Sequence, residues 1–385
     1  ITASPGIHTP MRRLFIIITV IVSLLTSVRI TAVEAGDSLP ADSCCHGASS
    51  TKWIRQLFDN GFQIHDPEVC YPGFPRFCLN IYNWGDRTFN SYDTTYVVGT
   101  GKNWKLQAKS YNWMESSMMV FPKRTSIAMH SDLYSDAGIS LSFMAVSIGY
   151  MWNVNKLFSS PTNRRTFNFD FTCSRFAINY QSVSSTGGMI ITQFGDYQTD
   201  HRLHYRFDEA SFNAKTLDAY WFFNNYKYSQ GAAYSYSKYQ LRNAGTPLVG
   251  INLTWQDISN DFSVLPPDML AASPLDTPHF YTQYRSYCAL GGYAYNWAIR
   301  PRKWVLNTSA LVAVGYRQFL ETSSHTSDIA RFANNFRLNI AAVYNHKALF
   351  AALTTRMQGF INYNPGDMTH FNSYVSFTAA VGMRF

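Results

Sequence analysis

The stretch from residue 371 to residue 385 alternates between apolar and polar side chains with a period of two. One face carries Phe371, Val375, Phe377, Ala379, Val381, Met383 and Phe385. The other face carries Asn372, Tyr374, Ser376, Thr378, Gly382 and Arg384. Successive side chains of a strand point to opposite sides of its sheet, so the pattern predicts a strand with one apolar and one polar surface. Such a strand belongs either to a half-buried sheet or to a membrane barrel.

Both ends of the sequence favour the membrane barrel. A strand that closes on Val381, Met383 and Phe385 resembles the C-terminal insertion signal of bacterial outer-membrane barrels. Near the other end, a basic start (Met11-Arg12-Arg13) precedes a short apolar run and a small-residue cleavage site, which predicts a secretory signal peptide over residues 11–35. The apolar run is shorter than the roughly 20 residues that a spanning helix needs. Residues 1–10 are interpreted as translation upstream of the start methionine.

The composition agrees with a barrel that faces lipid. Aromatic residues make up 16% of the chain and charged residues only 15%. Aromatic side chains gather in girdles at both edges of a lipid-facing band, within which charges are disfavoured. The formal net charge of +8 is compatible with anionic lipid head groups or an anionic solute. It gives no indication of nucleic acid binding.

Periodicity predicts an all-β fold, a transmembrane antiparallel up-and-down β-barrel of about twelve strands over residues 101–385. A short, partly helical periplasmic extension is expected over residues 36–100, with an amphipathic helix near residues 52–61. The strands are expected near residues 102–115, 119–131, 137–152, 164–172, 176–191, 216–228, 246–258, 280–299, 303–317, 331–344, 348–363 and 371–385.

The lengths of the connections give an independent indication. Links after even-numbered strands are mostly tight, at residues 131–136, 173–175, 300–302 and 345–347, whereas links after odd-numbered strands are mostly long. Short periplasmic turns and long outer loops would produce this parity. Two links depart from it. The first outer loop is short, and residues 229–245 form a long periplasmic connection in which we expect a helix across the barrel mouth.

A basic cluster on the inward face is the best functional lead. If the opposite faces contact lipid, four arginines on the last four strands point into the lumen: Arg317, Arg337, Arg356 and Arg384. Lys105, Lys109, Asp170 and Asp218 are candidates to join them from earlier strands. The functional hypothesis is a positively biased channel or a site for an anionic solute. The alternative is a lumen filled by ion pairs and tyrosine hydroxyls, in which the arginines are structural.

Enzymatic chemistry is the rival hypothesis, and it requires a nucleophile close to an oriented base. The run His130-Ser131-Asp132 contains the right residue types, but consecutive strand residues face opposite ways. His325 and His370, with nearby serines, are expected in outer loops. Asp200-His201 with His204 has only weak metal-ligand spacing, and Gly99-Thr100-Gly101-Lys102 lacks the phosphate-loop pattern and predicts a turn into the first strand. No catalytic residue, metal site or cofactor is predicted.

The six cysteines permit disulfides in an exported chain. Cys70 and Cys78 are the expected pair, because Cys44 and Cys45 are adjacent and cannot easily bridge each other. Cys173 and Cys288 fall in different predicted strands or turns.

Three motifs resemble those of a known Bacteroidetes family. The first is Phe89-Asn90-Ser91-Tyr92-Asp93-Thr94-Thr95-Tyr96-Val97 followed by Gly101-Lys102-Asn103-Trp104. The second is Tyr228-Ser229-Gln230-Gly231-Ala232-Ala233-Tyr234 with Gln240, Ala244-Gly245 and Gly250, and the third is Gly291-Gly292-Tyr293-Ala294-Tyr295-Asn296-Trp297 with Lys303-Trp304. Over residues 50–385 the chain is similar to the family catalogued as domain of unknown function 4421. The resemblance implies an outer-membrane barrel and supplies no activity.

Taken together, the residues favour a non-enzymatic outer-membrane protein: a small channel, or a barrel that anchors or partners an envelope complex. The alternative is a lipid-modifying hydrolase or acyltransferase. The partners expected are outer-membrane lipids, the barrel-assembly machinery during insertion, and an envelope protein. A lumen closed by tyrosines and ion pairs would favour the anchor, and a His–Ser contact at the outer rim would favour the enzyme.

Overall fold

A computed structural model describes residues 53–60, 69–73, 75–77, 79–80, 91–102, 104–122, 125–143, 146–154, 163–197, 203–323, 331–364 and 368–385. The expected signal peptide and the residues before it lie outside this part of the chain. The chain divides into two compact units, residues 1–60 with 64–72, and residues 61–63 with 73–385.

In the first unit, helix α2 (Trp53–Asp59) forms where the sequence predicts a short amphipathic helix. Leu57 is buried, whereas Ile54 is exposed, so the apolar face of the helix is narrower than expected. The ring of Trp53 lies 5.8 Å from that of Tyr71, which ties the helix to the segment that follows it.

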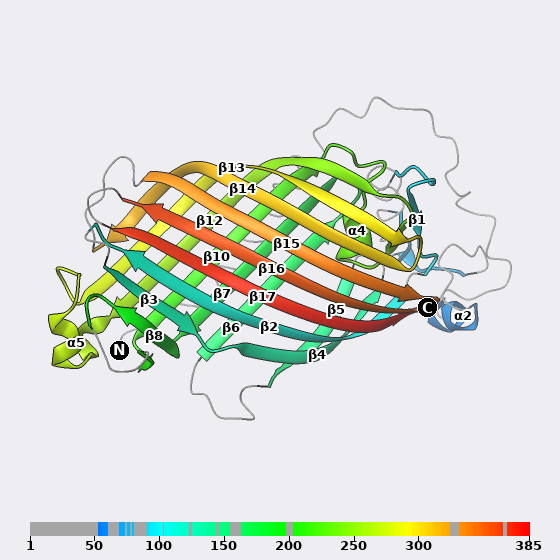
Figure 1. Cartoon of the computed structure of the whole chain (residues 1–385). Coiled ribbons are helices and arrows are strands. Elements are labelled where there is room, and N and C mark those ends of the chain that lie inside the picture. The colour runs from blue at the N-terminus through cyan, green and yellow to red at the C-terminus, as the bar shows by residue number, and fades with distance from the viewer. Residues whose placement is uncertain are drawn as a thin grey trace. The chain divides into compact units, whose positions relative to one another are not determined.

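The second unit is mainly an antiparallel β structure (Figure 1). Its strands are β1 (Val97–Gly99), β2 (Trp104–Val120), β3 (Ser126–Ser131), β4 (Tyr134–Phe143), β5 (Val146–Asn153), β6 (Asn163–Thr172), β7 (Phe176–Thr186), β8 (Met189–Phe194), β9 (Tyr205–Phe207), β10 (Ala210–Phe222), β11 (Lys238–Gln240), β12 (Ala244–Asp261), β13 (His279–Arg300), β14 (Trp304–Thr322), β15 (Phe332–His346), β16 (Leu349–Tyr363) and β17 (Thr369–Arg384). The helices are α4 (Gln230–Ala233), η3 (Phe262–Val264) and α5 (Pro267–Ala271).

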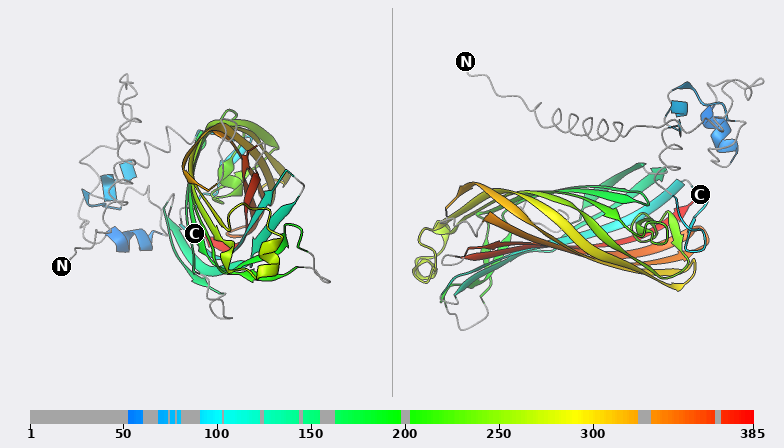
Figure 2. Two further views of the ribbon diagram at one scale, coloured as in Figure 1. Left: turned by 90° about the vertical axis from the view of Figure 1, so that its left-hand side faces the viewer. Right: turned by 90° about the horizontal axis from the view of Figure 1, so that it is seen from above.

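The paired strands return to their starting point and form a barrel, which Figure 2 shows end-on. The pairing runs from β7 through β10 and β12 to β17, then to β2 and β3, and β3 pairs with β8. β8 continues β7 after Gly187 and Gly188, which have φ values of 73° and 68°. Glycine adopts positive φ without steric cost, so the two residues allow the strand to bend. The predicted antiparallel up-and-down barrel is therefore confirmed.

The wall contains twelve strands when each interrupted strand (β3 with β4, β7 with β8, β9 with β10) is counted once over the described residues. Near its middle β2 changes partner from β3 to β4. Within the described chain, β5 pairs with β4 alone and β6 with β7 alone. The ring thus closes through β3 and β8, and β5 and β6 do not pair with each other as a simple succession of strands would require.

Two predicted turns in the early strands are wrong. The sequence prediction ends a strand before Ser116-Ser117 and places a turn at residues 131–136, but β2 runs through both serines to Val120. The Ser116 hydroxyl bonds that of Ser373 on β17 at 2.7 Å, so this serine belongs to the sheet and not to a loop. The chain reverses instead between β2 and β3, in a link that begins with Phe121-Pro122, and between β4 and β5, because each of these pairs is antiparallel. Proline lacks the N–H that a strand interior needs, which favours the turn at Pro122.

The later connections follow the predicted parity. Short links at residues 173–175, 301–303 and 347–348 lie at one end of the barrel, called here the turn end. Long links, including residues 262–278 with η3 and α5, lie at the opposite loop end. The connection between β10 and β12 contains α4 near the turn end, in agreement with the predicted helix (Figure 1).

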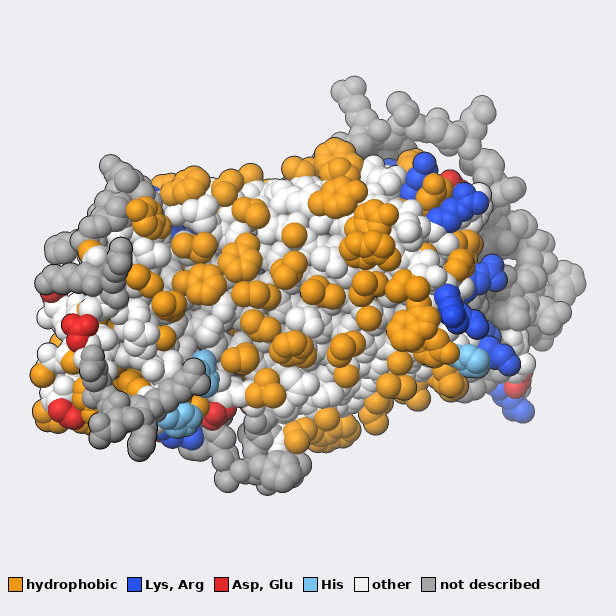
Figure 3. Space-filling model, in the orientation of Figure 1, with side chains coloured by type: hydrophobic (Ala, Val, Ile, Leu, Met, Phe, Trp, Pro, Cys, Tyr) orange, Lys and Arg blue, Asp and Glu red, His pale blue; other side chains and the backbone are white. Residues whose placement is uncertain are grey.

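Side chains alternate between the lipid-facing and inward surfaces as the sequence predicts. On β14, Val312 and Tyr316 are 56% and 52% exposed, whereas Asn307 and Ser309 are buried. On β17, Val381 is 63% exposed and Arg384 is buried. Figure 3 shows hydrophobic side chains spread over the middle of the barrel wall, with Lys and Arg side chains gathered at the turn end.

Charge on the lipid-facing surface should prevent stable insertion. Val312 lies at the middle of β14 and faces outward, so Val312→Arg should destabilise the inserted barrel by about 2–4 kcal/mol. Val312→Leu keeps the apolar surface and should leave stability close to wild type. Urea unfolding in lipid vesicles measures both, and equal stability of the two variants would contradict the assigned register.

Aromatic stacking between the end of β17 and the start of β2 should support assembly. Phe385 and Trp104 exchange backbone hydrogen bonds of 3.0 Å, and their rings stack at 6.4 Å with an interplanar angle of 9°. Phe385→Ala should lower the yield of folded barrel, and Phe385→Tyr should preserve it because the ring remains. Heat-dependent migration in gel electrophoresis reports the folded fraction. A normal yield for Phe385→Ala would count against both this contact and the predicted insertion signal.

Candidate functional site: a closed lumen

A segment between β10 and β12 occupies the turn end of the barrel interior. This segment, residues 223–243, is called the plug. Its side chains Tyr228, Ala233 and Tyr236 are buried, and α4 forms its centre. β11 in the plug pairs with β1, which precedes the barrel, so two segments far apart in sequence meet at this end. The turn end of the lumen is therefore filled by a buried segment that connects two wall strands, and it is not an open mouth.

Polar side chains of β13 and β14 bind the plug to the wall. The Asn307 amide donates to the Tyr228 hydroxyl at 3.0 Å and accepts from the Tyr234 hydroxyl at 2.8 Å. The Asn296 amide donates to the Ser229 carbonyl and to the Gln240 side chain, both at 2.9 Å. Asn307 also donates to Asn296 at 2.7 Å.

All four residues from Tyr228 to Gly231 in the plug are buried, together with Gln240. A buried polar group without a partner costs about 1–3 kcal/mol. The polar groups of the plug and the wall residues Asn296 and Asn307 therefore stabilise the folded protein only when both are in place. Burial raises the pKa of the Tyr228 hydroxyl well above its usual value, which keeps it neutral and able to donate.

Arg384, one of the four predicted lumen arginines, also holds the plug. Its Nε donates to the Tyr236 carbonyl at 2.8 Å, and its Nη2 donates to the Asn345 side chain at 2.6 Å. Lys105 on β2 donates to the neighbouring Ser235 carbonyl at 2.7 Å. Two cations thus bind backbone carbonyls of the plug from adjacent strands, and charge-assisted bonds of this kind are stronger than neutral ones.

Two further predicted arginines form ion pairs across the lumen. Both Arg356 Nη atoms lie 3.3 Å from the Asp170 carboxylate oxygens, and Asn179 donates to the same carboxylate at 2.6 Å. Arg337 pairs with Asp218, which also accepts from the Asn252 amide at 2.6 Å. The Arg337 and Asp218 side chains are only 11% and 2% exposed. Both aspartates were candidates from the sequence, and each neutralises one arginine.

The fourth predicted arginine, Arg317, is fully buried nearer the loop end. Its Nη2 donates to the Ile361 carbonyl at 3.1 Å, and its guanidinium carbon lies 4.6 Å from the centre of the Tyr284 ring. A cation over an aromatic face is stabilised by the ring quadrupole. The four arginines therefore occupy several levels of the interior and have separate partners. They do not line one shared constriction.

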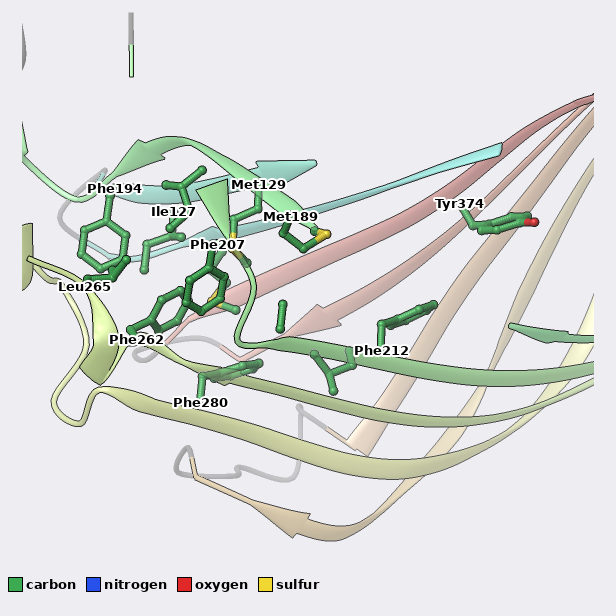
Figure 4. Packing of buried hydrophobic residues seen from close by; sticks show 14 of the residues in the cluster. Ile127, Met129, Met189, Phe194, Phe207, Phe212, Phe262, Leu265, Phe280 and Tyr374 are labelled. Atoms are coloured by element: carbon green, nitrogen blue, oxygen red, sulfur yellow. The ribbon is translucent and has the colours of Figure 1, made fainter. Parts of the chain in front are cut away.

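Apolar side chains fill the loop end of the interior, as Figure 4 shows. Phe194, Phe207 and Phe262 are almost completely inaccessible, and the Phe207 and Phe262 rings stack at 5.2 Å. The cluster draws on the inward faces of β3, β8, β10 and β13 and on the loop that contains η3 and α5. Sequence periodicity did not predict this cluster, because the interior of a barrel was expected to be polar.

Cavities between the described side chains of the interior are small. One, of about 20 Å³, lies beside Asp218, Asn335 and Arg337, and another, of about 10 Å³, lies beside Glu115, Met129 and Asn372. Ligand pockets are usually about 300–1,000 Å³. The two cavities share no lining residue, so they are separate packing gaps in a filled interior.

The two described histidine–serine candidates for catalysis make different contacts. His130 Nδ1 contacts the Ser131 carbonyl and not its hydroxyl, which instead donates to the Asp132 carbonyl, so this tripeptide forms no triad. His370 was expected in a loop but lies on β17, where Nε2 is 2.9 Å from the Ser117 hydroxyl. Both side chains are buried inside the barrel, and His370 Nδ1 has no hydrogen-bond partner in the described structure.

The remaining sequence candidates form no site in the described part of the chain. His325 and Asp200-His201 lie outside the described residues, and in the described part no three His, Cys, Asp or Glu side chains gather as a metal site would require. Gly101 has a φ of 70° and lies in the turn before β2, as predicted.

Among the described cysteines, one is disulfide-bonded and two are free thiols. Cys70 is disulfide-bonded, and its predicted partner Cys78 lies outside the described residues. Cys173 and Cys288 are free and buried.

Among the described residues, no helix combines the length and apolar character needed to cross a membrane.

Comparison with known proteins places the chain in a family. The family model described as "Domain of unknown function (DUF4421)" matches residues 91–385. No curated protein matches the chain.

Among solved structures, the chain is similar to three barrel proteins at low identity. The P. putida toluene transporter TodX is 7% identical with a TM-score of 0.25, covering 78% of this chain and 97% of that one. A bacterial polysaccharide outer membrane secretin is 12% identical with a TM-score of 0.30, covering 74% and 99%. A Pseudomonas aeruginosa FadL homologue is 9% identical with a TM-score of 0.24, covering 74% and 91%.

The Arg337–Asp218 pair should be costly to break from one side only. Arg337→Met leaves a buried, unpaired carboxylate and should lower the free energy of unfolding by about 3–5 kcal/mol. The double variant Arg337→Met with Asp218→Leu removes both charges and should recover most of that loss. Urea unfolding of the single and double variants tests this, and a double variant less stable than the single one would contradict the pairing.

Proposed function

The chain belongs to the DUF4421 family, and we propose that it is an outer-membrane β-barrel with a closed lumen that anchors or partners an envelope complex. The observation that carries this proposal is the plug bound to Asn296, Asn307, Arg384 and Lys105. A segment with this many directional bonds to the wall is a permanent part of the interior. The apolar cluster closes the loop end independently.

The internal ion pairs and hydrogen bonds of the lumen arginines support an anchor rather than an anion channel. Arg337 and Arg356 are neutralised by aspartates, and Arg384 is bound to the plug. Selectivity for an anion requires charges that are free to face a passing solute. Here the local charges are used by internal partners, so the interior offers a solute no continuous basic surface.

The surface of the barrel supports its placement in the outer membrane. Exposed apolar side chains such as Val312 and Ile340 form the middle of the wall, and exposed Trp297 and Trp304 lie near the turn end. Apolar bands edged by aromatic residues are the mark of membrane barrels. The predicted signal peptide would direct the chain out of the cytoplasm, and the turn end would then face the periplasm. The predicted insertion signal at Val381, Met383 and Phe385 would be read by the barrel-assembly machinery.

Conductance tests the closed lumen directly. The purified wild-type protein, reconstituted in planar bilayers, should give no discrete current steps although the barrel is folded. The matched control replaces residues 227–241 and residues 262–278 with short flexible linkers, which removes both closures. That variant should conduct if it folds, since β10 and β12 are already paired beside the first replacement.

Discrete, anion-preferring steps from wild-type protein would overturn the anchor proposal in favour of a channel. In that case Arg356→Gln would be compared next, because Arg356 faces the more exposed part of the lumen. A silent wild type beside a conducting control supports the proposal.

A lipid-modifying enzyme is the second candidate, and the Ser117–His370 contact favours it. A serine hydroxyl 2.9 Å from a histidine nitrogen is the geometry of a nucleophile beside its base. The pair lacks a described group to orient the histidine, and both residues are buried, which is why this candidate is second.

A fluorophosphonate probe distinguishes the two candidates. An activated Ser117 should be labelled in the wild type and lost in Ser117→Ala, while Ser116→Ala, on the opposite face of β2, keeps the label. Absence of labelling in folded wild-type protein eliminates the enzyme.

A further inference from the structure

Two hairpin turns place four cations together at the turn end of the wall. Arg300 is the last residue of β13, Arg302 and Lys303 lie in the turn between β13 and β14, and Lys347 lies in the turn between β15 and β16. The Asn345 N–H donates to the Lys303 carbonyl at 2.7 Å, which fixes the two turns side by side. All four basic side chains are exposed. Figure 3 shows Lys and Arg side chains gathered at this end of the molecule.

The backbone of both turns is specific. Arg302 and Lys347 have φ values of 61° and 52°, a left-handed conformation that residues other than glycine rarely adopt. Each reversal therefore carries a long cationic side chain where glycine would be the easier choice. None of the four cations has an ion-pair partner among the described residues.

Apolar and aromatic side chains continue directly from these cations along the outer wall. Ile299 and Leu349 are 65% and 52% exposed, and Trp304 is 43% exposed with its ring 4.7 Å from that of Tyr344. Tryptophan and tyrosine prefer the level of lipid head groups, where one part of the ring is apolar and the other wet. Charge and apolar surface thus follow one another in the order of a lipid head group and its acyl chains.

We infer that Arg300, Arg302, Lys303 and Lys347 form a binding site for the phosphate head group of an anionic phospholipid in the adjoining leaflet. The phosphate would lie among the four cations, and the acyl chains would lie along Ile299, Trp304 and Leu349. A soluble anion would gain the charge contacts without the apolar ones, so the combination favours a lipid. The site rests on the proposed placement of the barrel in a membrane and is independent of whether the lumen conducts.

Lipid competition in native mass spectrometry tests this site. Detergent-solubilised full-length protein is incubated with phosphatidylglycerol or with phosphatidylcholine of the same acyl chains, and bound lipid is counted. Wild-type protein should prefer phosphatidylglycerol. Each basic side chain near an anionic surface contributes a factor of about five, so the double variant Arg302→Gln with Lys347→Gln should bind it about 25-fold more weakly.

A matched control separates a site from general attraction. Lys215→Gln with Arg285→Gln removes the same charge from exposed positions of the wall nearer the loop end, where both residues pair with Trp255. This control should keep wild-type affinity for phosphatidylglycerol. An equal loss in both double variants, or no lipid preference in the wild type, would overturn the site. A conducting wild type that still prefers phosphatidylglycerol would overturn the closed lumen and leave this site standing.

Discussion

The pairing of β17 with β2 is the constraint on which the rest of the barrel depends. Sixteen residues of β17, from Thr369 to Arg384, pair in unbroken register with β2. A backbone N–H or C=O left unpaired in lipid costs several kcal/mol, so a membrane sheet must have its edges satisfied. This pairing joins the two ends of the barrel sequence and fixes which side chains of both strands face inward. The register places Arg384 opposite Lys105, and these are the two cations that bind the plug.

Closing the ring creates an interior that must be filled by partners of matching chemistry. At the turn end the filling is polar, and asparagines and cations of the wall bind side chains and carbonyls of the plug. In the middle, aspartates neutralise arginines. At the loop end the filling is apolar, and Phe194, Phe207 and Phe262 pack as they would in a soluble core. The same wall thus holds two types of closure, and this is the physical basis of the proposed anchor.

Much of the wall could be predicted from the sequence, whereas most of the contacts inside it could not. The last strands alternate cleanly, so parity alone placed Val312 and Val381 outside and Arg384 inside. The bounds predicted for the early strands were wrong at Ser116 and Ser117, because serines are common in turns. Their hydroxyls instead bond Ser373 and His370 on β17, a contact between positions more than 250 residues apart. The Asn307–Tyr228 bond has the same character: the motif around Tyr228 was visible, but its partner became evident only in the folded barrel.

Cys288 offers the most direct measurement of the closed lumen. This free thiol is buried on the inward face of β13, between the plug and the apolar cluster. A membrane-impermeant, charged thiol reagent is applied to the reconstituted wild type, and modification of the Cys288 peptide is read by mass spectrometry. A Val264→Cys variant, with its new thiol at an exposed position of the loop end, reports that the reagent is active. With a closed lumen, Cys288 should stay unmodified in the folded barrel while the introduced thiol reacts, and Cys288 should react only after unfolding. Rapid modification of Cys288 in folded protein would mean that the lumen is open to water, which would contradict the closed barrel.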